Sequence, residues 1–145
     1  MKMKEEVKKW CEEEEIFREE VEDPNSEFNF AINFPDKTQV LNVIQPKGKD
    51  YIFIVSRTLV TSEDQKKLKE KTKDKYEEFL WDLRFTLANR PTQFNLTITD
   101  GVLQDFTITY RIYEDGLTKH NFMQAIREVH KSKLLAIWKM MYALR

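Results

Sequence analysis

Residues that break regular structure are scarce in this chain, which has only 3 glycines and 4 prolines in 145 residues. Because glycine and proline are the usual residues of turns, we expect long helices and strands joined by short loops. Hydrophobic residues make up 41% of the chain and aromatic residues 12%, and both fractions indicate a buried core rather than a disordered chain. We therefore expect a single folded domain that spans residues 1–145.

Cysteine and histidine are also scarce, and this excludes several kinds of site. Cys11 is the only cysteine, so the chain can form neither an internal disulfide nor a zinc site built from thiolates. It follows Trp10 and precedes four glutamates at 12–15, surroundings that raise rather than lower the pKa of a thiol. The two histidines, His120 and His130, lie nearly three turns apart on a predicted helix, which is too far to share a metal ion.

No catalytic constellation can be assigned from the residue types and their spacing. No serine occupies a nucleophile-elbow motif, and no glycine-rich loop is present that could hold a phosphate. We therefore predict that the protein is not an enzyme, with no catalytic residues, no cofactor and no metal ion.

The sequence has neither a signal-peptide pattern nor an apolar run of the roughly 18 residues that a membrane-spanning helix needs. We expect a soluble, cytoplasmic protein without a membrane partner. The net charge is −1, whereas a protein dedicated to nucleic acid normally has a clear basic excess. Nucleic acid is therefore not the expected partner.

Charge is nevertheless uneven along the chain. Residues 1–23 contain 10 acidic and 5 basic residues, whereas residues 117–145 contain 6 basic residues and 1 acidic residue. One interpretation is that the two predicted terminal helices lie near each other, or that each is simply a solvated face. The alternative is an acidic patch and a basic patch that each meet a partner.

The longest predicted element is one helix over residues 62–89, around which the rest of the chain is arranged. It opens with a capping box between Ser62 and Gln65, and it ends before Pro91. One broad face is apolar at helical spacing: Leu68, Tyr76, Phe79, Leu80, Leu83 and Leu87. A second apolar group, Trp81, Phe85 and Ala88, lies nearly opposite. The first face can cover a sheet, and the second needs another surface.

The remaining patterns predict two further helices and five strands. An amphipathic helix is expected from residue 2 to about residue 21, and a last helix is capped by Thr118 and runs to the C-terminus. Alternating or continuous apolar residues predict strands over 28–34, 38–45, 51–56, 93–99 and 102–113. Asp100 and Gly101 join the last two strands as a tight hairpin. The order α-βββ-α-ββ-α predicts an α+β fold, in which helices pack on a five-stranded antiparallel sheet.

This succession of elements, from Lys4 to Leu144, resembles the type III secretion chaperone-like fold, which also occurs in small uncharacterised prokaryotic proteins. The resemblance is one of topology. It implies a chaperone-like module, because those chaperones are typically acidic dimers that hold an extended segment of a client protein. The basic last helix departs from that pattern.

The last helix is apolar nearly all round over residues 134–144. Its predicted core stripe is Phe122, Ile126, Val129, Ile137, Met140, Met141 and Leu144. Leu135, Trp138 and Tyr142 lie on the other side. Together with Trp81, Phe85 and Ala88 they are the candidate interface, since aromatic residues dominate binding energy at interfaces and a soluble monomer rarely exposes a patch of this size. The competing interpretation is that they pack helix against helix within one chain.

We therefore predict a non-enzymatic, homodimeric protein-interaction or chaperone-like module with an unknown protein client. A first alternative is a small-molecule-binding domain or enzyme, with a pocket between sheet and helices lined by Tyr51, Tyr110 or Arg111. A second alternative is nucleic-acid binding through the basic last helix.

Overall fold

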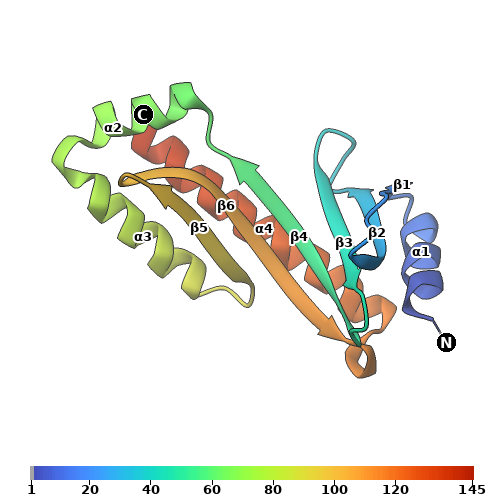
Figure 1. The fold of residues 1–145 in the computed structure, drawn as a ribbon. Coiled ribbons are helices and arrows are strands. Elements are labelled where there is room, and N and C mark those ends of the chain that lie inside the picture. The colour runs from blue at the N-terminus through green and yellow to red at the C-terminus, as the bar shows by residue number, and fades with distance from the viewer. Residues whose placement is uncertain (1) are drawn as a thin grey trace. The chain divides into compact units, whose positions relative to one another are not determined.

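The computed structural model describes residues 2–145 and shows a mixed α+β fold with one antiparallel sheet (Figure 1). The helices are α1 (Met3–Glu13), α2 (Ser62–Thr72), α3 (Tyr76–Ala88) and α4 (Lys119–Leu144), with short 3₁₀ helices η1 (Lys73–Lys75) and η2 (Glu114–Gly116). The strands are β1 (Phe17–Glu20), β2 (Ser26–Asn33), β3 (Val40–Pro46), β4 (Tyr51–Leu59), β5 (Gln93–Thr99) and β6 (Val102–Tyr113). Their order in the sheet is β1-β2-β3-β4-β6-β5. The predicted α+β class is confirmed, but the sheet has six strands, not five.

The chain forms two compact units. Unit 1 comprises residues 2–56 and 109–130, and unit 2 comprises residues 57–108 and 131–145. Strands β4 and β6 and helix α4 each contribute residues to both units. The expectation of a single domain stays a prediction.

The extra strand, β1, lies within residues 2–21, which the sequence predicts as a single helix. Helix α1 ends at Glu13, and the chain turns through Glu15, whose φ is 57°. Strand β1 then pairs antiparallel with β2, with Phe17 opposite Ile32. Phe17 fits a helical apolar stripe by spacing, but in the structure it lies half-buried on a strand, where its ring meets that of Phe30 edge-on at 5.4 Å.

The core of unit 1 lies on the side of the sheet where alternate residues are fully covered. On β2, β3 and β4 these residues include Phe28, Phe30, Ile32, Leu41, Val43, Ile52 and Ile54. Helix α1 contributes Met3, Val7 and Cys11, and the ring of Trp10 lies 5.7 Å from that of Phe122 on α4.

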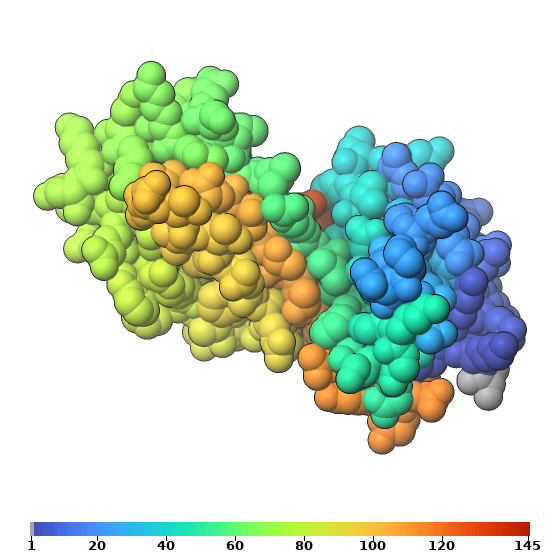
Figure 2. All heavy atoms as spheres, in the orientation of Figure 1, coloured from blue at the N-terminus to red at the C-terminus, as the bar shows by residue number. Residues whose placement is uncertain are grey.

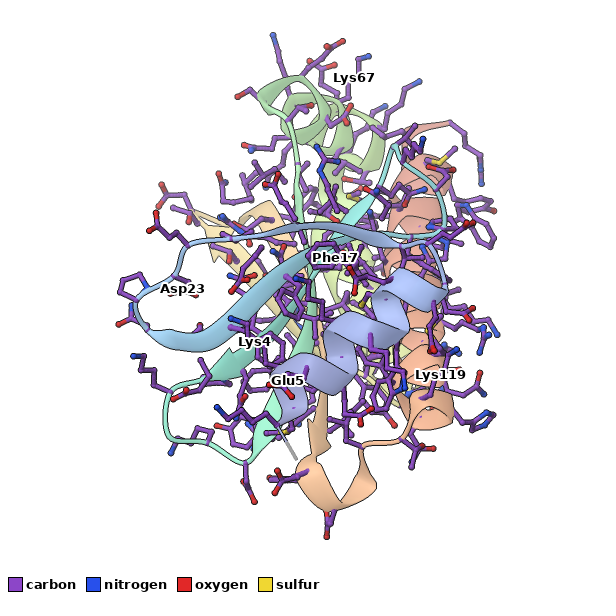
Figure 3. All side chains as sticks on the ribbon, turned by 90° about the vertical axis from the view of Figure 1, so that its right-hand side faces the viewer. Lys4, Glu5, Phe17, Asp23, Lys67 and Lys119 are labelled. Carbon is purple, nitrogen blue, oxygen red and sulfur yellow. The ribbon has the colours of Figure 1, made fainter. Side chains whose placement is uncertain are left out.

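The acidic and basic ends of the chain meet within unit 1 (Figure 3). The ammonium of Lys119, in the first turn of α4, lies 3.1 Å from the Glu13 carboxylate and 3.0 Å from that of Glu14. Lys4 on α1 pairs in the same way with Glu20 on β1, at 2.9 Å. The uneven charge of the sequence is thus explained in part by pairing inside the chain.

The predicted long helix of unit 2 is broken, which corrects the expectation of one helix over residues 62–89. Lys73 takes φ 51° and ψ −119°, a conformation that an α-helix cannot continue through, so α2 ends at Thr72 and α3 begins at Tyr76, after the short η1. Figure 1 shows the change of direction between them. The cap is also one residue earlier than predicted, because the Thr61 hydroxyl accepts from the Asp64 amide at 3.1 Å.

The predicted core face of these helices is correct despite the break. Its six residues are all at least 92% buried: Leu68, Tyr76, Phe79, Leu80, Leu83 and Leu87. The break changes the direction of the chain without changing which side chains face the core.

A predicted hairpin turn and a predicted helix cap are both confirmed. Asp100 and Gly101 both have positive φ, 53° and 74°, as a two-residue hairpin turn requires. The Thr118 hydroxyl accepts from the Asn121 amide at 3.1 Å and caps α4. The predicted core stripe of α4 is wrong at Met141, which is 60% exposed.

Over residues 2–145, no helix has the length and apolar character needed to cross a membrane.

Candidate interaction surface

Four large aromatic side chains of unit 2 stand exposed on two helices. Trp81 and Phe85 on α3 are 49% and 66% exposed, and Trp138 and Tyr142 on α4 are 58% and 66% exposed. We call these four residues the aromatic face. Aromatic side chains of this size are usually at least half-buried in a soluble monomer, so their exposure needs an explanation.

The aromatic side chains are held in defined positions. The Trp81 and Phe85 rings lie 5.8 Å apart at an interplanar angle of 33°. The guanidinium of Arg84 lies over the Trp81 ring at 4.5 Å, and that of Arg145 over the Tyr142 ring at 3.8 Å. Such cation–π contacts orient exposed rings that would otherwise sample several rotamers.

One ion pair links the two helices that carry the aromatic face. The Asp82 carboxylate on α3 lies 2.9 Å from the Lys139 ammonium on α4. Asp82 directly follows Trp81, and Lys139 directly follows Trp138. The pair therefore places both tryptophan-bearing stretches on adjoining parts of unit 2.

Two open hollows adjoin at this ion pair. The first, of about 490 Å³, is lined by Asp74, Glu77, Glu78, Trp81, Asp82 and Phe85. The second, of about 390 Å³, is lined by Lys71, Thr72, Lys75, Glu78, Phe79, Asp82, Lys139, Tyr142, Ala143 and Arg145. Figure 2 shows helices α2 and α3, in green to yellow-green, at the outer surface of unit 2.

The hollows differ in charge. Four carboxylates and no basic group line the first, which we call the acidic hollow. Three lysines and one arginine line the second against two carboxylates, and we call it the basic hollow. Aromatic side chains line both hollows, Trp81 and Phe85 the acidic one and Phe79 and Tyr142 the basic one.

The structure places the predicted interface residues as follows. Five of the six are exposed, namely the aromatic face and Ala88, while Leu135 is half-buried. Sequence reasoning placed Lys139 on the same side of the last helix as Trp138, but it missed Asp82, the ion pair between the two residues and the exposure of Met141. The periodicity of each helix gives its faces, but no pattern in the sequence shows that α3 and α4 are neighbours.

The residues considered for catalysis belong to unit 1. Cys11 is fully buried, and burial, with a smaller contribution from the Glu12 charge, raises the pKa of its thiol to about 12. His120 is exposed at the start of α4, and the His130 ring meets that of Phe34 edge-on at 5.6 Å. Within residues 2–145, no three acidic, histidine or cysteine side chains converge as a metal site would require.

The three residues proposed for a ligand pocket are only partly brought together. In unit 1 the guanidinium of Arg111 lies 4.4 Å from the centre of the Tyr51 ring, whereas Tyr110 is not among the rings around it. Sequence reasoning missed the other two rings, Phe53 and Tyr113, which a two-residue strand period could have indicated.

Comparison with known proteins gives a family. A family model described as an uncharacterized conserved protein matches residues 3–140 of the chain. The chain belongs to the DUF2299 family. No curated protein matches this DUF2299 chain significantly.

Two crystal structures resemble the DUF2299 chain. An uncharacterized protein from Methanothermobacter thermautotrophicus is 35% identical, with a TM-score of 0.92 over 98% of this chain and 99% of the other. YbjN from E. coli, described as a candidate transcription regulator, is 12% identical, with a TM-score of 0.54 over 99% of this chain and 90% of the other. The second likeness is one of fold alone.

Proposed function

We propose that this DUF2299 protein is a non-enzymatic protein-interaction module that forms a homodimer through its aromatic face. The observation that carries the proposal is the exposure of Trp81, Phe85, Trp138 and Tyr142 on adjoining parts of unit 2. Tryptophan and tyrosine are the residues that most often dominate binding energy, and burying them removes apolar surface from water.

The distribution of charge supports a two-fold arrangement. In a two-fold dimer both copies use the same surface, so the acidic hollow of each copy can face the basic hollow of its partner. Like-charged hollows would then be kept apart, which fixes the register of the contact. The exposed pair of Asp82 and Lys139 would lie near the centre and lose water on association.

The chaperone-like part of the proposal rests on topology. The order of elements resembles the type III secretion chaperone-like fold, and we place the family in that superfamily as part of the same proposal. A cytoplasmic protein client is the partner that this resemblance implies. The dimer is the part of the proposal that rests on exposed side chains, and it is tested first.

Sedimentation equilibrium of the wild type and of Trp138→Glu tests the dimer. We expect a dimer at micromolar concentration for the wild type and a folded monomer for the variant, because the new carboxylate would be buried without a partner. Leu59→Glu is the matched control, since Leu59 is 66% exposed on β4 outside the aromatic face, and it should leave the dimer intact. A monomeric wild type, or a Trp138→Glu variant that still dimerises, contradicts this use of the face.

A further inference from the structure

A second surface, in unit 1, surrounds one arginine with aromatic rings. The guanidinium carbon of Arg111 on β6 lies 4.4 Å from the ring centre of Tyr51, 4.9 Å from that of Phe53 and 5.9 Å from that of Tyr113. We call these four residues the arginine platform. Two of the rings come from β4, and Tyr113 comes from β6 beside it.

The rings support one another, and together they fix the guanidinium. The Tyr51 ring meets those of Phe53 and Tyr113 edge-on, at 5.2 Å and 5.5 Å. Arg111 donates one hydrogen bond from Nη1 to the Tyr113 hydroxyl at 3.1 Å. Because a guanidinium has five N–H groups, most of its donors are still available for a ligand.

The platform lies on the side of the sheet away from the core of unit 1. Ile52 and Ile54 are fully buried, so the intervening Phe53 and the preceding Tyr51 project from the opposite side. Ile44 on β3 is the cross-strand partner of Phe53 and continues the apolar strip on that side. Tyr51, Phe53 and Ile44 are half-buried, while Arg111 is exposed.

Arg111 forms no ion pair with any residue from 2 to 145, unlike several other basic side chains of the protein. Arg57 and Lys119, for example, each lie within 3.1 Å of a carboxylate. The groups around the Arg111 guanidinium are a phenol and aromatic rings, none of which neutralises a full positive charge. A single fixed cation beside apolar rings is therefore left without an anion.

We propose that the arginine platform binds a carboxylate that is attached to an apolar or aromatic group. The planar fork of arginine matches the two oxygens of a carboxylate. One cation balances one negative charge, whereas a phosphate dianion would call for a second. The apolar part of the ligand would lie along Tyr51, Phe53 and Ile44. Such a ligand can be the C-terminus of a peptide that ends in an apolar residue, or a small free acid.

NMR titration of ¹⁵N-labelled full-length protein with N-acetylphenylalanine tests the site. We expect the amide signals of residues 51–53 and 111–113 to shift on addition of the acid. The neutral analogue N-acetylphenylalaninamide should bind about tenfold more weakly, since it cannot accept the paired hydrogen bonds of the fork. Absence of shifts at millimolar acid, or equal binding of acid and amide, would overturn the proposal.

Variants separate the platform from general attraction of anions to basic side chains. Arg111→Gln should weaken binding of the acid about tenfold, and Arg111→Lys should also weaken it because the charge is kept but the fork is lost. The control Arg127→Gln removes an exposed arginine of α4 in the same unit and should leave binding unchanged. Undiminished binding by Arg111→Gln, or an equal loss in the control, contradicts the assignment.

Two further ligands test the preference for a carboxylate and then identify its source. Phenyl phosphate should bind no more tightly than N-acetylphenylalanine, and clearly tighter binding would overturn the choice of a carboxylate. A tetrapeptide that ends in phenylalanine with a free C-terminus distinguishes the remaining sources. Tighter binding than the single acid supports a peptide terminus, and equal binding supports a small acid. The aromatic face of unit 2 takes no part in these titrations, so their result is independent of the proposed dimer.

Discussion

The hydroxyl oxygen of Tyr76 accepts a hydrogen bond from the backbone N–H of Leu103 at 2.9 Å. Both residues are buried, Tyr76 at the first position of α3 and Leu103 near the start of β6. The bond ties the beginning of α3 to the sheet directly after the break at Lys73. Burial raises the pKa of the Tyr76 phenol, so the group stays neutral across the physiological range.

Replacing Tyr76 by Phe should lower the free energy of unfolding by about 1–3 kcal/mol, because the Leu103 N–H would be left buried without a partner. Urea denaturation followed by circular dichroism measures the loss. Tyr110→Phe is the control, since the half-buried Tyr110 hydroxyl makes no hydrogen bond to residues 2–145. Equal stability of Tyr76→Phe and the wild type would show that this bond contributes nothing.

The break between α2 and α3 can be tested with glycine. Lys73 has φ 51° and ψ −119°, a conformation that glycine adopts far more easily than lysine. Lys73→Gly should raise the free energy of unfolding by about 1 kcal/mol. Lys71→Gly, inside α2, should lower it by about 1 kcal/mol. If both variants lose the same stability, residue 73 lies within a helix in solution.

The hairpin turn requires the same positive φ at Gly101, where the chain already has a glycine. Its φ of 74° is unfavourable for a β-branched residue, although an added Cβ would meet nothing closer than the Lys69 ammonium at 4.0 Å. Gly101→Val should therefore lower the free energy of unfolding by about 1–2 kcal/mol through backbone strain alone. Gly116 lies outside the positive-φ region and has free space around it, so thermal unfolding of Gly116→Val should show a much smaller change.

The buried carboxylate of Asp105 makes part of the stability dependent on pH. It accepts hydrogen bonds from Arg57 at 3.0 Å and from Thr97 at 2.9 Å, and these two bonds, the first above all, hold its pKa below the usual range. Because the unfolded chain binds this proton more readily, the contribution is present above about pH 4 and is lost as the pH falls further.

Asp105→Asn should consequently be less stable than the wild type at pH 7, with a difference that shrinks on acidification below about pH 4. Urea midpoints measured from pH 7 down to pH 2.5 give this difference. A gap that stays constant over the whole range would mean that the carboxylate has the same pKa in the folded and unfolded chain.

Cys11 should be inert while the protein is folded. Its side chain is fully buried and the pKa of its thiol is about 12, so at pH 8 the reactive thiolate is scarce and shielded. Reaction with a disulfide reagent should be about a hundredfold slower in buffer than in guanidinium chloride. Comparable rates in the two solvents would contradict the buried position.

Patterns with a strong local cause were predictable from the sequence. The Asp100–Gly101 turn and the Thr118 cap are each set by residues within a few positions, and the structure confirms both. The α3 core face was also predictable, since burial follows the spacing of leucines whether or not α2 continues into it. The α+β class follows from the same patterns.

Features set by contacts between distant segments were not predictable. Phe17 satisfies both a helical stripe and strand β1, and only the Phe30 ring of β2 decides between them. Nothing local marks Lys73 as the end of α2, because lysine favours helices and the break depends on how the chain packs. The ion pair of Asp82 and Lys139 likewise depends on which helices are neighbours.

The two units are interleaved along the chain, and this bears on how the protein is made. Unit 1 requires residues 109–130, and unit 2 requires residues 131–145, as shown by the buried contact of Thr92 with Ser132 at 2.7 Å. Domains usually fold one after another as they emerge from the ribosome. Here a nascent chain that has reached only residue 108 contains neither unit complete, so both hydrophobic cores must wait for α4 to be synthesised.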